Sequence, residues 1–374
     1  MQSRNNKVMK KLDYYIGIPL LYFLGIFHVK NKLPDLLDRG KPYHFVLLKT
    51  AAIGDTILLS AIAQELKSYY PESHITLVCS QNNAAMGKLL HEIDDIYVFK
   101  MNNPLISLFK IKRLHNIDVI LDFAAWTRIN GLIAWTLKSK CKIGFYCKAM
   151  HRHYVYDICV EHKDTLHEID NYRNILRCLN LPLKKFIPYI IPQEKFNASN
   201  LVQGKYVVFH LFPGGASADL RSWANEKWIE LGKRIFSKYG YAIILSGGNE
   251  DCKHAQQILS MLLKVGVSAV SVAGVISLDE LNGVLRQAEL LVTVNTGIMH
   301  LGAAVNIPLI ALHGATDYKR WGPISAKAVV VQSNEPCQPC ISLGFESKCR
   351  NPVCMQNITV DMVWEQVKKA TKLH

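Results

Sequence analysis

The stretch from Leu290 to Pro323 constrains the fold of this chain more than any other, because apolar runs and turns follow one another there in a telling order. Leu290 to Val294 reads as a short buried strand, and the turn Asn295-Thr296-Gly297 ends it. Apolar residues then recur with helical spacing from Ile298 to Val305, and Leu309 to Leu312 is the next buried strand. A strand, a glycine turn, a helix and a second strand together predict one unit of a parallel sheet.

The turn before the predicted helix is suited to binding an anion. The first amides of a helix have no partner inside it, so a phosphate oxygen can accept their hydrogens and gains from the helix dipole. Thr296 and His300 add side-chain donors, and the cations Lys319 and Arg320 follow the second strand. These features indicate a diphosphate site. The alternative is an ordinary strand-to-helix turn that Thr296 caps.

A similar unit lies near the start of the chain. Residues 45–49 form a predicted strand, residues 50–55 a turn of small residues, and residues 56–69 a helix with one apolar face. Asp55 stands at the mouth of this turn. Its carboxylate is either the N-cap of the helix or a general base that points into a cleft.

Two more units of this kind occur in the second half of the chain. The predicted strand 206–211 runs into the glycine-rich turn 212–217, and Arg221 follows closely enough to reach a bound phosphate. The predicted strand 242–246 ends in Gly247-Gly248-Asn249-Glu250, where the carboxylate of Glu250 is placed to accept a hydrogen bond from a ribose hydroxyl.

Length and pattern predict two α/β domains after an N-terminal extension. The chain has 374 residues, more than one hydrophobic core usually holds. Strands alternate with helices in both halves, which predicts two parallel sheets with helices on both faces. The expected divisions are an extension at 1–42, a first domain at 43–190, a linker at 191–204, and a second domain at 205–374 with a cysteine-rich loop at 337–354.

Five motifs occur in the order seen in family 9 glycosyltransferases, which include the heptosyltransferases of lipopolysaccharide core synthesis: AIGDTILLSAIAQEL, FPGGASADLRSW, GGNED, VNTGIMHLGAA and ALHGATDYKRWGP. The chain resembles this family from Tyr43 to its C-terminus. The resemblance implies a GT-B fold, in which two Rossmann-like domains face each other across a cleft. It assigns the acceptor mainly to the first domain and the nucleotide-sugar donor to the second.

The resemblance also implies roles for individual residues. Asp55 matches the general base that takes the proton of the acceptor hydroxyl, and Arg221 matches a cation that contacts the donor phosphates. We expect Gly54 and Asp122, the latter at the end of a predicted strand, on the acceptor side. The expected donor-binding residues are Gly215, Ser217, Arg221, Glu250, Ile276, Asn295, Thr296, Gly297 and His300.

The implied reaction is inverting transfer of a sugar from a nucleotide diphosphate to a lipopolysaccharide core or a related surface glycan, with ADP-heptose as the first candidate donor. One departure from the family concerns the donor, because Asn295 stands where the family often has an aspartate. A UDP-sugar-dependent hexosyl or N-acetylglucosaminyl transferase is one alternative. A non-catalytic glycan- or lipid-binding relative is the other, although Asp55, Arg221 and His300 are all present.

Other classes of protein fit less well. No cofactor or metal is expected, since the chain has no Asp-x-Asp at a strand end, and a nicotinamide-dependent dehydrogenase would need a G-x-G-x-x-G that is missing after the first strand. The net charge of +14 is spread along the chain without a zinc finger or an aromatic RNA-binding signature, which argues against nucleic acid as a partner.

The extension carries an uninterrupted apolar and aromatic run from Tyr14 to Val29, flanked by Lys10, Lys11, Lys30 and Lys32. The run is shorter than a spanning helix and contains two glycines and a proline, so we expect it to lie in the membrane surface. Residues 10–32 would then hold the protein peripherally on the cytoplasmic face of the inner membrane, near a glycolipid acceptor. The alternative is a helix packed on the first domain.

Two clusters leave alternatives open. Cys337, Cys340, Cys349 and Cys354 form either a zinc or metal-cluster site or a group of reduced thiols, and the uneven spacing favours the thiols. The other six cysteines are expected to be buried thiols of a reducing compartment. His151-Arg152-His153 is either a contact to an acceptor phosphate or a solvated basic loop, and the loop is favoured.

Overall fold

The computed structural model describes residues 13–31, 38, 40–147, 150–191, 196–215, 217–341 and 349–371. Lys10, Lys11, Lys32 and residues 342–348 of the cysteine-rich loop lie outside them, as do residues 192–195 of the expected linker. The chain divides into two compact units, Met1–Pro188 and Tyr189–His374.

Unit 1 is built on a six-stranded sheet in which every neighbouring pair is parallel. The order is β3-β2-β1-β4-β5-β6, so that the chain starts in the middle, builds one half, and then returns to build the other. The strands are β1 (His44–Leu48), β2 (His74–Ser80), β3 (Asp95–Phe99), β4 (Ile117–Asp122), β5 (Ser139–Tyr146) and β6 (Ile158–Glu161).

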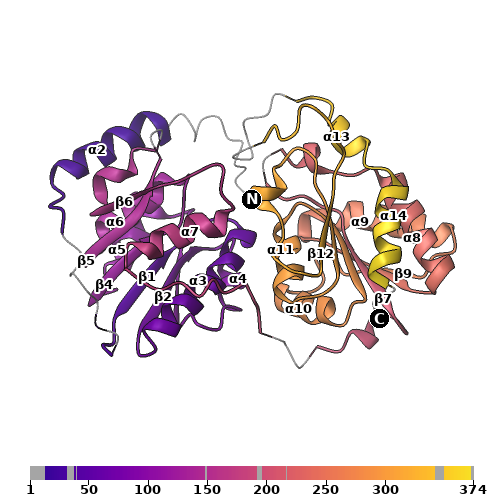
Figure 1. The fold of residues 1–374 in the computed structure, drawn as a ribbon, viewed down its shortest axis with the longest axis horizontal. Coiled ribbons are helices and arrows are strands. Elements are labelled where there is room, and N and C mark those ends of the chain that lie inside the picture. Colours follow the sequence, from indigo (N-terminus) through magenta and orange to yellow (C-terminus); the bar gives the residue numbers. More distant parts are fainter. Residues whose placement is uncertain are drawn as a thin grey trace. The chain divides into compact units, whose positions relative to one another are not determined.

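Helices cover both faces of this sheet (Figure 1). One layer contains α3 (Ile53–Tyr69), which packs against α4 (Ala84–Gly87) and α7 (Glu168–Arg177). The other contains α6 (Arg128–Thr136), which packs between α5 (Pro104–Ile111) and the 3-10 turn η3 (Arg152–Val155). This division follows from right-handed crossovers on either side of β1.

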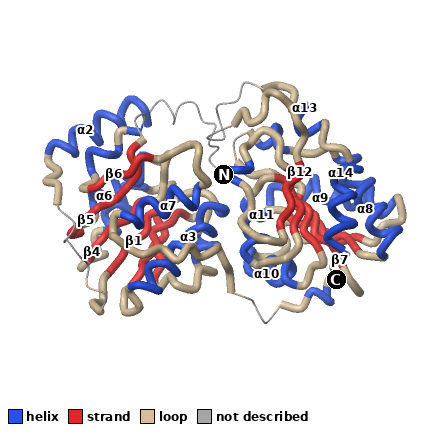
Figure 2. The backbone as a smooth tube through the Cα atoms, viewed as in Figure 1, coloured by secondary structure: helices blue, strands red, loops and turns tan. Residues whose placement is uncertain are grey.

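Unit 2 repeats the same design with the order β12-β11-β10-β7-β8-β9. Its strands form one sheet with helices around it (Figure 2). Its strands are β7 (Tyr206–His210), β8 (Ala242–Ser246), β9 (Ala269–Ser271), β10 (Leu290–Val294), β11 (Leu309–Leu312) and β12 (Ala328–Val331). Its α-helices are α8 (Asn225–Tyr239), α9 (Cys252–Lys264), α10 (Leu278–Arg286), α11 (Gly297–Ala304), α12 (Tyr318–Trp321), α13 (Val353–Gln356) and α14 (Val360–Ala370), and its 3-10 turns are η4 (Ala198–Asn200), η5 (Ala218–Arg221) and η6 (Asn249–Asp251).

Both sheets have the strand order of a doubly wound Rossmann sheet. In each, the first strand of the unit lies in the middle, the second and third lie on one side of it, and the fourth to sixth lie on the other. The predicted α/β class with two Rossmann-like halves is therefore confirmed. The strands predicted at Ala242, Leu290 and Leu309 begin and end where the structure has them. These short apolar runs were recognisable because parallel strands are buried on both faces.

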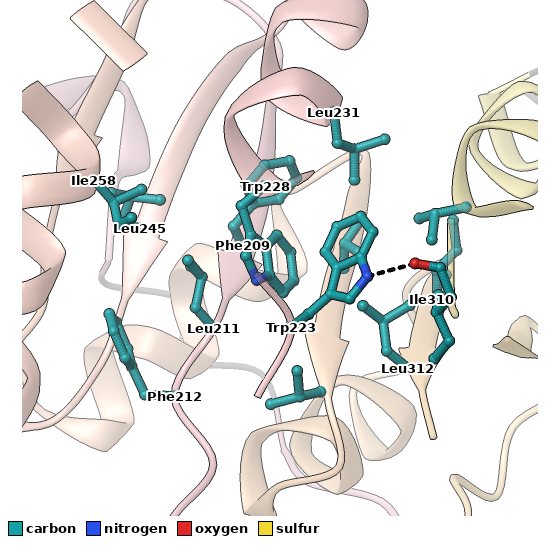
Figure 3. Close-up of a cluster of buried hydrophobic side chains, with 14 of the residues drawn as sticks. Phe209, Leu211, Phe212, Trp223, Trp228, Leu231, Leu245, Ile258, Ile310 and Leu312 are labelled. Atoms are coloured by element: carbon teal, nitrogen blue, oxygen red, sulfur yellow. Dashed lines mark hydrogen bonds between the residues drawn. The ribbon is translucent and has the colours of Figure 1, made fainter. Parts of the chain in front are cut away.

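The core of unit 2 joins the sheet to the C-terminal segment (Figure 3). Trp223 and Trp228 meet edge to face beside Phe209, and all three are buried. The indole Nε1 of Trp223 donates to the carbonyl of Ile358 at 2.8 Å. Because α14 begins two residues later and packs on α8, this hydrogen bond helps to hold the end of the chain on the sheet.

The boundary between the units differs from the expected one. Unit 1 ends at Pro188, and the described part of the expected linker lies in unit 2. Asn282 Nδ2 donates to the carbonyl of Ile191 at 3.0 Å, and Gln287 Nε2 donates to that of Phe196 at 2.8 Å. Ile191 and Phe196 are thus fastened to α10, because their backbone carbonyls, which would otherwise lose their hydrogen bonds to water, find partners there.

The N-terminal extension does not stand apart from unit 1. It forms the π-helical turn η1 (Asp13–Gly17) and helix α2 (Ile18–Ile26), and Leu21 is fully buried in the core of unit 1. A Cβ atom on Gly25 would lie 2.5 Å from Cβ of Tyr154, so only glycine permits this approach of α2 to η3. Beyond α2, His28 Nε2 lies 3.1 Å from Asp157.

The alternative of a packed helix therefore describes α2, and the expectation of a separate extension at 1–42 is corrected. A wholly apolar run gives no sign of which neighbour buries it, so sequence could not decide. Among the helices of the described residues, none is both long and apolar enough to span a bilayer.

Docking of α2 makes a prediction about its amides. Leu21→Ala removes the side chain that anchors α2 and should weaken docking by about 3 kcal/mol, so that α2 amides exchange hydrogen about a hundredfold faster. Leu20→Ala, in the adjacent and exposed side chain, is the matched control and should change exchange little. Hydrogen exchange followed by mass spectrometry checks this. Unprotected α2 amides in the unaltered protein would contradict the docked arrangement.

Candidate functional site

Each sheet has one point at which the strand order reverses, and ligands of doubly wound proteins bind beyond the carboxyl ends of the strands at that point. In unit 1 the point lies between β1 and β4, and in unit 2 between β7 and β10. The loops that follow these four strands carry most of the residues expected in the site.

Asp55 lies in the first turn of α3, after β1. The N-cap of this helix is Ala52, which has φ 69° and makes no side-chain capping bond, so Asp55 is not the cap. Its Oδ2 lies 2.8 Å from Nζ of Lys49, and its side chain keeps 21% of its surface exposed. Asp55 is thus held by a buried cation while it remains open to solvent.

Lys49 was not expected in the site. Its ammonium group also donates to the carbonyl of Phe123 at 3.0 Å and lies 5.1 Å from the ring centre of Tyr172. It thereby ties the end of β1 to the segment after β4. The sequence did contain a signal for Lys49, because it directly follows an apolar strand. A charged group at the end of a buried strand must either pair with a partner or reach solvent.

A second set of contacts supports the same loops. Thr50 Oγ1 donates to Oδ1 of Asn130 at 2.6 Å, and Asn130 Nδ2 donates to Asp122 Oδ1 at 3.0 Å. Gly54 is buried beside Asp55. The expected acceptor residue Gly54 therefore lies in the first turn of α3, where its backbone is buried next to Asp55.

Asp122 does not lie where a substrate can reach it. Its side chain is fully buried, and its Oδ2 lies 2.7 Å from Nη1 of Arg152, which is also fully buried. Tyr156 donates its hydroxyl hydrogen to the same oxygen, and burial raises the pKa of Tyr156 well above its ordinary value. The acceptor contact expected for Asp122 and the solvated loop expected for Arg152 are both wrong, because the two charges neutralise each other inside unit 1.

In unit 2, Arg221 joins the two loops at the reversal point. Its Nη1 donates to the carbonyl of Asn295 at 3.0 Å, and its Nη2 donates to that of Gly214 at 2.6 Å. The turn between β7 and Arg221 bends through Gly215 at φ 84° and Ser217 at φ 57°. The guanidinium group thus fixes the shape of the glycine turn and carries a positive charge at the carboxyl edge of the sheet.

Helix α11 begins at the same edge. Thr296 is its N-cap and accepts a hydrogen bond from the amide of Ile298 at 3.1 Å, so the capping predicted as an alternative is present. Gly297 is the first helical residue, and His300 lies nearly buried one turn later. Capping uses one amide and leaves the positive end of the helix dipole at the edge of the sheet.

Two buried histidines, His313 and His210, lie at the carboxyl ends of β11 and β7, close to these loops. Asn295 Nδ2 lies 3.4 Å from both ring nitrogens of His313, and His313 Nε2 lies 3.3 Å from the sulfur of Met299. Burial, with smaller contributions from His300 and Arg221, lowers the pKa of His313 to about 3. Burial likewise lowers the pKa of His210, beside Ser246, to about 4. Both imidazoles are neutral near pH 7.

Glu250 and Ile276 lie in the loops after β8 and β9. Glu250 is exposed in η6, and Ile276 is half-buried just before α10. The amide of Gly274 donates to the carbonyl of Gly247 at 3.0 Å, which ties these two loops together. Both residues therefore stand at the same edge of the sheet as Arg221.

The cysteines are free thiols in the structure, and Cys337, Cys340, Cys349 and Cys354 all belong to the described residues. Burial raises the pKa of Cys354, and the neighbouring Cys340 and Cys337 act in the same direction. Within the described ranges, no group of three or more histidine, cysteine, aspartate or glutamate side chains is arranged to hold a metal ion.

Comparison with known proteins identifies the family. The model of glycosyltransferase family 9 (heptosyltransferase) matches residues 111–350. The chain belongs to glycosyltransferase family 9. It is accordingly a glycosyltransferase, as the motifs around Asp55, Arg221 and Thr296 predicted.

Relatives extend the match beyond these residues. Lipooligosaccharide heptosyltransferase 2 of Haemophilus influenzae is 22% identical over 315 residues, which cover 77% of this chain and 88% of that protein. The solved family 9 glycosyltransferase of Veillonella parvula has a TM-score of 0.75 at 18% identity and covers 91% of this chain and 100% of that one. ADP-heptose lps heptosyltransferase II of E. coli has a TM-score of 0.72 at 18% identity, with 88% and 99% covered. The glycosyltransferase shares their two-domain fold.

The neutral state of His313 makes a prediction about acid stability. An unfolded imidazole binds a proton near pH 6.5, whereas folded unit 2 excludes it until about pH 3, so the unfolded state binds more protons between these values. Stability should therefore fall on acidification below about pH 6.5, by up to about 1.4 kcal/mol per pH unit for this group.

Urea unfolding followed by tryptophan fluorescence checks this. The loss of stability between pH 7.5 and pH 5 should be about 2 kcal/mol smaller in His313→Gln than in the unaltered enzyme. His254→Gln, in an exposed histidine of α9, is the control. Parallel pH profiles for all three proteins would show that His313 does not stay neutral in the fold.

Proposed function

We propose that this glycosyltransferase transfers heptose from ADP-heptose, with inversion at the anomeric carbon, to a lipopolysaccharide core or a related glycolipid. Family membership supports the reaction class. The donor is supported by a relative named for ADP-heptose and by a solved E. coli heptosyltransferase with ADP-2-deoxy-2-fluoro heptose, which has a TM-score of 0.69 at 16% identity. The position of Asp55 is the observation that carries the mechanism.

Asp55 is the general base. Lys49 engages its Oδ2 at 2.8 Å, which fixes the carboxylate and leaves Oδ1 to take the proton of the acceptor hydroxyl. The acceptor oxygen then attacks the anomeric carbon from the side opposite the diphosphate, and the sugar–phosphate bond breaks. A carboxylate that is anchored at one oxygen and solvent-accessible supports this role better than a helix cap would.

Unit 2 stabilises the leaving diphosphate. Negative charge grows on the phosphates as the bond breaks, and fixed positive groups lower the energy of that state. Arg221 and the start of α11 at Thr296 and Gly297 provide them, with His300 and the Gly215–Ser217 turn beside them. Since His313 is neutral, it adds no positive charge to that of the guanidinium and the helix end.

Glu250 and Ile276 would hold the nucleoside, Glu250 through a ribose hydroxyl and Ile276 through apolar contact with the base. Asn295 would face the donor sugar with an uncharged amide. This change keeps a UDP-hexose or UDP-N-acetylhexosamine donor as the second candidate, because loss of the carboxylate alters the group that selects the sugar.

The glycolipid acceptor places the reaction at a membrane. Residues 10–32 would hold the enzyme peripherally on the cytoplasmic face of the inner membrane, since α2 leaves the aromatic side chains of Tyr22 and Phe23 exposed.

The choice of nucleotide is testable by thermal shift with ADP, UDP, GDP and CMP and their sugar conjugates. A nucleotide at about 100 times its Kd stabilises the folded state by about 2.7 kcal/mol, so we expect ADP and ADP-heptose to raise the Tm by about 5 °C. A selective shift with UDP would replace the proposed donor. No shift with any nucleotide would favour a non-catalytic relative.

The role of Asp55 is testable by substitution. Asp55→Asn should lower kcat by about 10²- to 10⁴-fold and change the Kd of the donor less than about twofold, because it removes the base and keeps the shape. Asp95→Asn is the control, since Asp95 is an exposed carboxylate at the amino end of β3. Assays of sugar transfer and donor titrations measure both quantities. Equal loss of turnover and donor binding would make Asp55 structural.

A further inference from the structure

Helices α2, α6 and α5 of unit 1 form one continuous layer (Figure 1). Helix α6 contacts both of the others, and Leu21 of α2, Ile133 of α6 and Ile111 of α5 belong to a single buried cluster. The inner side of the layer is therefore a shared core, and the outer side of all three helices belongs to one surface of unit 1.

That outer side is unusually apolar. In α5, Leu105 is 78% exposed and Phe109 is 72% exposed, and their spacing of four residues places them on one side of the helix. In the α2 segment, Phe23 is 56% exposed and Phe27 is 63% exposed. We call the following set the apolar face: Tyr14, Tyr15, Ile16, Leu20, Tyr22, Phe23, Ile26, Phe27 and Val29 of the α2 segment, Met101, Leu105, Ile106 and Phe109 of the α5 segment, and Trp135 of α6.

Cations predominate among the charges that flank the apolar face in the sequence, although Asp13 directly precedes Tyr14. Residues 14–31, 100–117 and 123–156 contain no aspartate or glutamate. The α5 segment has Lys100 before the helix and Lys110, Lys112 and Arg113 at its end, and Lys138 follows α6. Exposed apolar residues that gather on neighbouring helices mark an interaction site, and cations at their margin indicate an anionic partner.

We propose that the apolar face inserts into the headgroup–acyl boundary of an anionic phospholipid bilayer, with α5 as a second point of insertion beside α2. It extends the membrane contact proposed above for residues 10–32, and rests on it only for α2. Aromatic and aliphatic side chains with lysines at the margin are the composition that binds such a boundary. An acidic protein groove would match the cations equally, but it would have to cover three helices at once.

Two points of insertion have a geometric consequence. One apolar helix would let unit 1 rotate about its axis on the membrane. Because α5 is joined to α2 through α6, contact at both fixes which side of unit 1 meets the lipid.

Vesicle flotation without any nucleotide-sugar or glycan acceptor tests the proposal. The full-length protein should float with vesicles that contain phosphatidylglycerol and much less with phosphatidylcholine alone. The double variant Leu105→Asp/Phe109→Asp should lower the partition coefficient about tenfold, and Phe23→Asp/Phe27→Asp by a similar factor. Leu263→Asp, in a 52% exposed leucine of α9 in unit 2, is the control and should float as the unaltered protein does.

Two further experiments test the role of the cations and confirm that the variants fold. Lys110→Gln/Lys112→Gln should weaken binding to the anionic vesicles about fivefold for each cation removed, and less at high salt. The nucleotide thermal shift should be the same in all these variants, which separates failure of the surface from failure of the proposed transferase. Normal flotation of Leu105→Asp/Phe109→Asp would overturn the role of α5. If flotation is unchanged and the unaltered protein forms a dimer that Leu105→Asp/Phe109→Asp does not form, the apolar face binds a second copy of the chain instead of lipid.

Discussion

In each unit a cation holds together the two loops at which the strand order reverses. Lys49 connects the end of β1 to Phe123 after β4, and Arg221 connects Gly214 after β7 to Asn295 after β10. The carboxyl ends of parallel strands lie at the same edge of the sheet, so carbonyl groups of the loops that follow them come close together. A side chain with several N–H donors can then satisfy carbonyls from two loops at once. Asp55 in unit 1 lies beside Lys49, and Thr296 in unit 2 directly follows Asn295, whose carbonyl Arg221 binds.

The two cations differ in a way that suits different tasks. Lys49 is a compact charge on a flexible stem and pairs with one carboxylate oxygen, whereas the planar guanidinium of Arg221 spans two carbonyls. The neighbouring histidines do not compete with Arg221 for an anion, because burial keeps His313 and His210 uncharged. These two buried imidazoles therefore add no positive charge beside Arg221 near neutral pH.

Much of the fold was predictable from sequence because the strands and turns are specified by residues that are close together in the chain. Short apolar runs such as Leu290–Val294, punctuated by glycine turns, gave both the strands and the loops that carry Arg221 and Thr296. Pairings between distant residues were not predictable, since Arg152 finds Asp122 only when β4 and η3 are brought together. Lys49 and Asp55 are six residues apart, but their ion pair depends on the bend at Ala52. The apolar run of α2 was recognised, whereas its burial against Tyr154 needed the tertiary structure.

The close contact of Gly25 with Tyr154 also limits how the chain can be shortened. The resemblance to other family members begins near Tyr43, which makes that residue an obvious starting point for a trimmed protein. Removal of α2 with the preceding segment would uncover Tyr154, Gly131 and the other residues on which α2 packs. Newly exposed core surface promotes aggregation, so a trimmed chain should be less soluble than the full one despite losing its most apolar stretch. Helix α2 thus acts as a cover for unit 1 as well as a surface in its own right.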